Sequence, residues 1–196
     1  MSFDPEPMDP SNKKLLLYQY CVVSFVEWFE TEFQSENNDI SVLKSMKLLY
    51  FLTASSAFVH DNIIHRDYFS NFFAMPYGPV ESHIYDLLKV SKGKLSHLTI
   101  NSTKTTLRYS IQESYERISD DLNDQLAINA IHRALDFLKE SNNSFIKMKS
   151  FELVDYSHMW YSWRKNMAIA NANGMNSQPI PPEDIENDSV NLQLAY

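Results

Sequence analysis

Glycine and cysteine are scarce in this chain of 196 residues, which contains three glycines and one cysteine. Glycine usually makes up about 7% of a protein, and long windows of the chain also lack proline, so breaks in regular structure are few. This pattern favours long helices. Cys21 has no second thiol to pair with, which fits a reducing cytoplasm, and its apolar helical setting indicates a small core residue.

Long apolar runs and basic clusters are missing as well. No stretch approaches the roughly 18 apolar residues of a membrane span, and the start MSFDPEPMDP is acidic where a signal peptide is basic and then apolar. We therefore expect a cytoplasmic protein without membrane contact. The net charge is −8, with no convincing basic stripe, which disfavours nucleic-acid binding and favours a basic protein partner.

Motifs of enzymes and metal sites are also missing. The chain has no Gly-rich phosphate loop, no nucleophile-elbow serine and no paired-carboxylate signature. His60 and His65 are five residues apart, which places them on different sides of a helix, and no cysteine cluster or HExxH motif accompanies them. We predict no metal, no cofactor and no enzymatic activity.

Helical spacing dominates what is present. Hydrophobic residues make up 44% of the chain and aromatic residues 13%, enough for a sizeable core. Apolar residues with a period of 3.6 predict a helix over 12–33, capped by Ser11, and a fully apolar central helix after the cap Ser41. Further helices are predicted over 80–90, from a cap at Asp120 or Asp121 to Ser141, and over 150–172.

Two short segments alternate instead with a period of two. Ser96, Leu98 and Ile100 form one, and the second contains Leu107, Tyr109 and Ile111; the turn-forming NSTKT separates them, so we predict a β-hairpin. The predicted fold class is mainly α, an α-rich α+β protein: a single compact helical domain of about five helices with one small β-hairpin.

The domain is expected to span residues 12–175, between a flexible leader, 1–11, and an acidic C-terminal tail, 176–196. Prolines and acidic residues mark the leader. In the tail, Pro181 and Pro182 mark the start of a short helix.

The stretch FFAMPYGPV contains two prolines and a glycine directly before a predicted helix. Proline fixes its own φ and restricts the residue before it, while Gly78 is free to take a positive φ. We predict a rigid elbow that leads into the helix, with Pro79 in its first turn.

Three separated segments carry a family resemblance. They read Lys47-Leu48-Leu49-Tyr50-Phe51, then Ala74 with Tyr77-Gly78-Pro79-Val80 and Ile84-Tyr85, and finally Leu153 with His158 and Trp163. This combination, across residues 43 to 165, resembles the Panacea domain of SocA-like antitoxins, a family that includes phage-associated GepA-like proteins. The chain departs from the family pattern at Met75-Pro76, where a Trp is common, and at Ser162, where a Pro is common.

The resemblance implies an antitoxin that binds a cognate protein toxin, encoded by the adjacent gene, and neutralises it by direct protein–protein interaction. The candidate partner-binding residues are Tyr77, Gly78, Pro79, Val80, Tyr85, His158, Trp160 and Trp163. Structural roles are open for the same residues. The FFAMPYGPV corner could have no role beyond leading the chain into the helix, and His158 could be a structural residue that bonds to the backbone among aromatic rings. Trp160 and Trp163 are predicted on one helix face and could be either core or interface residues.

Three alternatives remain open. A proteolytic adaptor would use the leader or the tail to deliver the toxin to a cytoplasmic protease. A phage-associated transcriptional regulator would need the nucleic-acid affinity that the charge disfavours. An unrecognised enzyme would centre on His158, for which the sequence offers no nucleophile.

Overall fold

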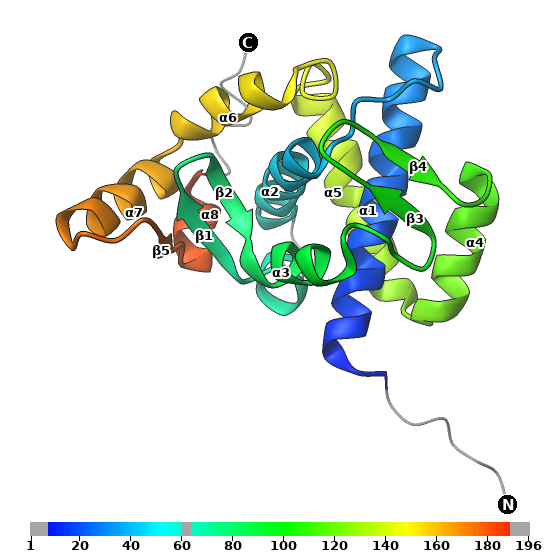
Figure 1. The fold of residues 1–196 in the computed structure, drawn as a ribbon, viewed down its shortest axis with the longest axis horizontal. Coiled ribbons are helices and arrows are strands. Elements are labelled where there is room, and N and C mark those ends of the chain that lie inside the picture. The colour runs from blue at the N-terminus through cyan, green and yellow to red at the C-terminus, as the bar shows by residue number, and fades with distance from the viewer. Residues whose placement is uncertain (1–7, 60–63, 189–196) are drawn as a thin grey trace, which may run out of the picture.

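The computed structural model describes residues 8–59 and 64–188, and its helices surround a central helix, α2 (Figure 1). The elements are α1 (Pro10–Phe33), α2 (Val42–Phe58), the π-helical turn η1 (Ile64–Tyr68), β1 (Phe72–Met75), β2 (Gly78–Glu81), α3 (Ser82–Ser91), β3 (Leu98–Ile100), β4 (Thr105–Leu107), α4 (Ile111–Leu122), α5 (Gln125–Ser141), α6 (Ser150–His158), α7 (Tyr161–Ala172), β5 (Gln178–Pro179) and α8 (Pro182–Asp188). The prediction of a mainly α, α-rich α+β fold is confirmed.

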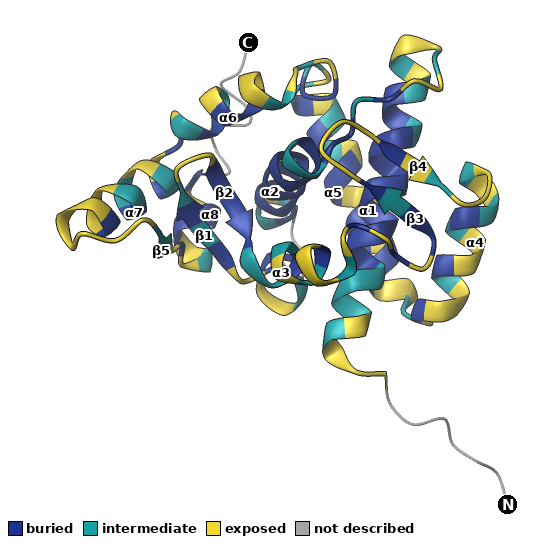
Figure 2. Cartoon of the chain, viewed as in Figure 1, coloured by how far each residue is buried: buried dark blue, intermediate teal, exposed yellow. Residues whose placement is uncertain are grey.

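The central position predicted for α2 is confirmed. Its run from Leu48 to Leu52 is fully buried, and α2 contacts α5, α6, α8, η1 and β2. The helix is mostly dark blue in Figure 2, with residues 44–56 buried, as expected for a helix that is apolar all round. Ser41 caps it as predicted, since its Oγ accepts a hydrogen bond from the Lys44 N–H at 3.2 Å.

Two other predicted helix caps are wrong. Asp9, rather than Ser11, caps α1 by accepting from the Asn12 N–H at 3.2 Å, because Pro10 takes the first helical position. Asp124, rather than Asp120 or Asp121, caps α5, because those two aspartates lie in the last turn of the separate helix α4.

The predicted β3–β4 hairpin is confirmed, with shorter strands. Leu98 pairs with Leu107, and Ile100 pairs with Thr105. Tyr109 lies beyond β4 and Ile111 begins α4, because the Ser110 side chain caps that helix by accepting from the Glu113 N–H at 3.2 Å.

The stretch FFAMPYGPV forms a second hairpin that the sequence analysis did not predict. β1 and β2 are antiparallel, with Met75 opposite Gly78, and β5 pairs with the other side of β1. The predicted helix start at Val80, with Pro79 in its first turn, is therefore wrong. The helix starts later because the Glu81 carboxylate caps α3 by accepting from the Ile84 N–H at 2.7 Å.

The single helix predicted over 150–172 is divided into α6 and α7. Trp160 is extended between them, with φ −76° and ψ 140°. The division coincides with a contact from the end of α8, where the Asp188 carboxylate accepts hydrogen bonds from the N–H groups of Tyr161, at 3.1 Å, and Ser162, at 2.5 Å. Asp188 thereby caps α7 from a distant point in the chain.

Residues 178–188, which the sequence analysis assigned to the acidic tail, pack against the domain. β5 lies beside β1, α8 contacts α2 and α7, and Ile185 is fully buried. The short helix predicted at Pro182 is confirmed. Within the described ranges, no helix has the length and apolar character that crossing a membrane requires.

Candidate functional site

The turn between β1 and β2 is held by side chains from the surrounding helices. Lys47, on α2, donates a hydrogen bond from Nζ to the Pro79 carbonyl at 2.6 Å. Trp163, on α7, donates from Nε1 to the Met75 carbonyl at 2.9 Å. The two bonds fix both ends of the turn, because each anchors one strand beside it.

His158, at the end of α6, holds the middle of the turn. Its ring is hydrogen bonded to the Pro76 carbonyl, and it stacks on the Trp163 ring with centroids 3.7 Å apart and an interplanar angle of 16°. Lys47, His158 and Trp163, from three helices, thus bind three carbonyls of the turn and of the strand ends beside it, and we refer to these residues as the turn clamp. Because each carbonyl is hydrogen bonded to a side chain on a helix, the turn has little freedom to move.

Gly78 is required by the close approach of the clamp. Its φ is +85°, as the sequence predicted, in the region that L-residues with a Cβ avoid. A Cβ at this position would collide with Ser157 Oγ and come within 3.0 Å of Lys47 Cε. Glycine is therefore needed both for the backbone conformation and for space.

Lys47 is the clamp residue that the sequence analysis quoted in a motif but did not assign to the site. Its side chain is fully buried, and no carboxylate in the described part of the chain pairs with it. Burial lowers its pKa from the ordinary 10.5 to about 7. A lysine within the apolar run Met46 to Leu52 was the available signal, since a buried lysine needs a polar partner.

His158 is only partly buried, and burial lowers its pKa, with a further lowering from the nearby Lys47 charge. A lowered pKa keeps the imidazole neutral at physiological pH. Its Nε2 is buried and has no hydrogen-bond partner among the described residues. Ser157, the adjacent hydroxyl, donates to the Val154 carbonyl at 2.7 Å. Among the described residues, neither Ser157 nor another hydroxyl or thiol is hydrogen bonded to His158 Nε2 as a nucleophile would be.

Trp160 lies beneath the clamp, in the core. It is 2% exposed, and its ring centroid is 5.4 Å from that of Tyr50 and 5.1 Å from that of Phe51. The K-L-L-Y-F segment and the late Trp-containing segment therefore meet in one aromatic cluster. Trp160 and Trp163 do not share a helix face as predicted, because Trp160 precedes α7 with an extended backbone.

The contacts of Ser162 explain why this chain has a serine where a proline is common in the family. Its Oγ and the Tyr50 hydroxyl are hydrogen bonded in the core, and its backbone N–H donates to Asp188. A proline here would have neither the hydroxyl nor the N–H. The serine therefore joins the aromatic cluster to the end of α8.

Tyr77 is the candidate residue that the turn exposes most. Its side chain is 64% exposed, whereas Gly78, Pro79 and Val80 are buried in β2. Its ring approaches that of Phe151, on α6, edge to face with centroids 6.4 Å apart. The turn points toward α6 in Figure 1, and α6 contacts β2. The clamp therefore presents one aromatic side chain to solvent.

Tyr85 is not brought to the turn. It lies on α3, which follows the opposite end of β2, and it is half-buried with Lys89 Nζ 4.1 Å from its ring centroid. The structure thus gathers the other candidates around the turn and places Tyr85 apart from them.

The histidine pair considered for a metal cannot be assessed as a pair, because His60 lies outside the described residues. His65 is fully buried, and its Nε2 lies 2.7 Å from the Glu186 carboxylate. No group of three or more His, Cys, Asp or Glu side chains within 8–59 and 64–188 is arranged to hold a metal ion.

Two surface hollows lie away from the turn clamp. One, of about 420 Å³, is lined by α1, β4 and the start of α4, and includes Glu30. Burial raises the pKa of Glu30, and the neighbouring Glu36 and Glu27 raise it further. The other, of about 470 Å³, is lined by α1 and the segment 91–96. Neither lining includes a candidate site residue.

Comparison with known protein families assigns the chain to one of them. The family described as antitoxin SocA-like, Panacea domain, matches residues 46–164, more than half of the sequence. The matched range begins just before Lys47 and ends just after Trp163, so it contains the whole turn clamp. This protein belongs to the family of SocA-like antitoxins with a Panacea domain. No curated protein and no solved structure matches the chain.

Proposed function

We propose that this protein is an antitoxin that binds a cognate protein toxin and neutralises it by direct interaction. The family membership supports an antitoxin role. The observation that carries direct binding is the exposed Tyr77 on a turn held by three buried or half-buried side chains. Tyrosine is enriched among the residues that dominate binding energy at protein interfaces.

A fixed turn suits such a contact. Binding costs free energy for every flexible side chain or loop that becomes ordered, and a preorganised surface avoids part of that cost. In this proposal Tyr77 touches the toxin, while Gly78, Pro79, Val80 and the clamp residues His158 and Trp163 hold it in place. Trp160 supports the same region from the core.

Tyr85 belongs to the proposal as an outer contact. β2 has four residues, a length of about 13 Å at the usual rise per residue, and Tyr85 follows its far end. A standard interface buries about 800 Å² on each partner, which is wide enough to reach from Tyr77 to α3. The partner is proposed to be the product of the adjacent gene.

The proposed activity is non-enzymatic and cytoplasmic. Cys21, the one cysteine, is free and buried, in keeping with a reducing compartment. Neutralisation of the toxin by direct binding (direct masking) needs no further partner, whereas an adaptor would also need a cytoplasmic protease. The same experiment separates the two mechanisms.

Co-expression with the product of the adjacent gene tests the proposal. We expect the toxin alone to arrest growth, the pair to grow, and the two proteins to purify as a stoichiometric complex while the toxin level stays unchanged. Loss of the toxin by protease-dependent turnover would replace direct masking with the adaptor mechanism. A toxic partner that is neither bound nor neutralised would contradict the proposal.

A further inference from the structure

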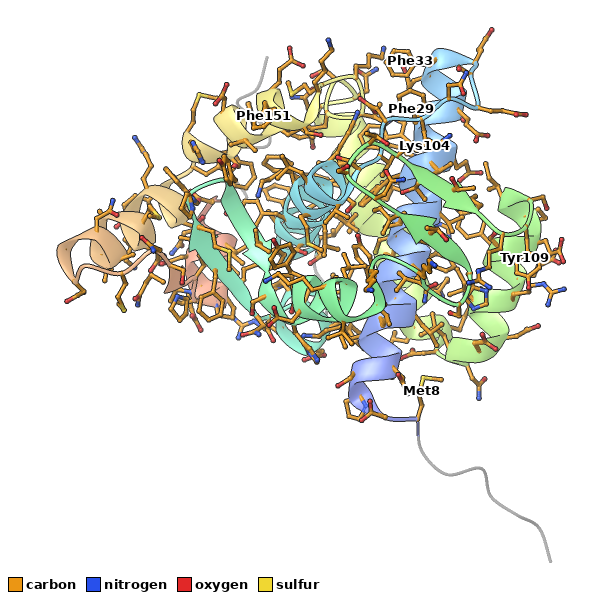
Figure 3. All side chains as sticks on the ribbon, in the orientation of Figure 1. Met8, Phe29, Phe33, Lys104, Tyr109 and Phe151 are labelled. Carbon is orange, nitrogen blue, oxygen red and sulfur yellow. The ribbon has the colours of Figure 1, made fainter. Side chains whose placement is uncertain are left out.

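The exposed side of α6 carries an apolar and acidic stripe next to Tyr77. Phe151, Asp155 and Met159 follow one another at intervals of four residues, so they lie on one side of the helix. All three are exposed, Phe151 at 64% and Met159 at 60%. Figure 3 labels Phe151 on α6, whose outer side is exposed in Figure 2. The stripe extends for about 12 Å along the helix.

The stripe and the turn form one continuous surface. The edge-to-face contact between Phe151 and Tyr77 joins them, with ring centroids 6.4 Å apart. We refer to Tyr77, Phe151, Asp155 and Met159 as the α6 surface. Its position is fixed by His158, on the same helix, which stacks on Trp163 and is hydrogen bonded to the turn.

Asp155 gives this surface its charge. Its carboxylate makes no hydrogen bond or ion pair with any residue in the described part of the chain. Asp120, on α4, is likewise exposed without a hydrogen bond or ion pair to the described residues. Asp155 differs from it because the exposed Phe151 and Met159 lie four residues to either side, on the same side of α6. A lone carboxylate among exposed aromatic and apolar side chains is complementary to a cation that also has apolar contact area.

We propose that the α6 surface binds a basic segment of the toxin, in which an arginine or lysine reaches Asp155 while apolar neighbours contact Tyr77 and Phe151. Arginine fits best, because a planar guanidinium bonds a carboxylate and stacks on aromatic rings at once. The net charge of −8 adds long-range attraction for a basic partner. This inference rests on the proposed antitoxin function and specifies the surface and chemistry of the contact.

The test uses two surface variants and two matched controls in the full chain. Phe151→Ala and Asp155→Lys change the α6 surface. Leu126→Ala, on α5, removes an apolar side chain that is also 64% exposed. Asp120→Lys reverses an exposed acidic charge on α4. The toxin product of the adjacent gene is titrated against each protein at low and high salt, with thermal unfolding as the check of folding.

We expect toxin affinity to fall at least tenfold for Phe151→Ala and for Asp155→Lys, and to change less than twofold for the two controls. Asp155→Lys should also lose part of the salt dependence, because its ion pair contributes to that dependence. Asp155→Asn removes the charge with almost no change in shape and should reproduce the loss in weaker form.

Two outcomes would overturn the inference, and they are distinguishable. If the wild-type protein neutralises the toxin and all variants bind it equally, the α6 surface is wrong while the proposed function stands. If the wild-type protein neither binds nor neutralises the toxin, the proposed function fails and this inference fails with it. Restored binding between Asp155→Lys and a toxin with one basic residue changed to glutamate would identify the paired residue.

Discussion

The two β-hairpins of this protein hold their turns in different ways. In the β3–β4 hairpin, Asn101 closes the turn locally, since its Oδ1 accepts from the N–H groups of Thr103 at 2.8 Å and Lys104 at 3.0 Å. Lys104 marks this turn in Figure 3. In the β1–β2 hairpin, the turn carbonyls are bound by Lys47, His158 and Trp163.

The difference concerns what each turn is attached to. A turn closed by its own side chains keeps its shape without the rest of the protein. Both turns are tied to α2, since the Val42 N–H donates to the Asn101 carbonyl at 2.9 Å. The β1–β2 turn is held by side chains of two further helices, α6 and α7, and so keeps its position relative to these as well. Tyr77 therefore has a fixed place beside Phe151 and α6, which a shared binding surface needs.

Gly78→Ala should produce the largest effect on the clamped turn. A positive φ costs an alanine about 1–2 kcal/mol, and the collision with Ser157 and Lys47 adds about 1–3 kcal/mol of overpacking. We expect the free energy of unfolding in urea to fall by about 2–5 kcal/mol.

The matched control for this variant is Gly174→Ala. Gly174 also has a positive φ, +67°, but nothing lies within 4 Å of an added Cβ. It should show the backbone cost of about 1–2 kcal/mol alone. Equal losses for the two variants would contradict close packing at the clamp.

Lys47→Met should remove a pH dependence of stability. The folded protein lowers the pKa of Lys47 from 10.5 to about 7, so between these values the unfolded chain binds the extra proton. The free energy of unfolding therefore rises with pH from 7 to 10.5 and is unaffected by this group below pH 7. From pH 7 to 9.5 the wild type should gain about 3 kcal/mol more than Lys47→Met. If the free energies of unfolding of the wild type and of Lys47→Met, measured in urea, changed in parallel with pH, Lys47 would not be a buried, unpaired lysine.

Trp163→Phe should have a smaller effect that separates the two hairpins. The variant keeps an aromatic ring for His158 but loses the Nε1 donor to Met75, at a cost of about 1–2 kcal/mol. Asn101→Ala, in the other hairpin, should cost about 1 kcal/mol. Of the two, only Trp163→Phe should weaken toxin binding measured by calorimetry. A similar loss of affinity in Asn101→Ala would show that the turn clamp is not specific to function.

The same contrast explains which parts of the fold were predictable. The β3–β4 hairpin and the cap of α2 depend on neighbouring residues, and the sequence predicted both. The helix α4 was missed because Tyr109 and Ile111 continued the alternating pattern of β4 beyond its end. The division between α6 and α7 was missed because the carboxylate that caps α7, Asp188, is 26 positions from Ser162.

The proximity of most candidate residues to one another was predictable, but their contacts were not. The motif resemblance pointed to Tyr77 through Val80, His158 and Trp163, which do meet around one turn. The role of Lys47 depends on a carbonyl 32 positions away, and no local pattern reports such a distance. Phe151 and Asp155 were not among the candidates, because their exposure depends on how α6 packs.

The most direct test of the account is the affinity of Tyr77→Ala for the toxin, measured by calorimetry beside its urea unfolding. Since Tyr77 is mostly exposed, its loss should change the free energy of unfolding by no more than about 0.5 kcal/mol. The toxin affinity should nonetheless fall at least tenfold, about 1.4 kcal/mol. Unchanged affinity in a stable Tyr77→Ala protein would contradict the claim that the clamped turn exists to present this side chain.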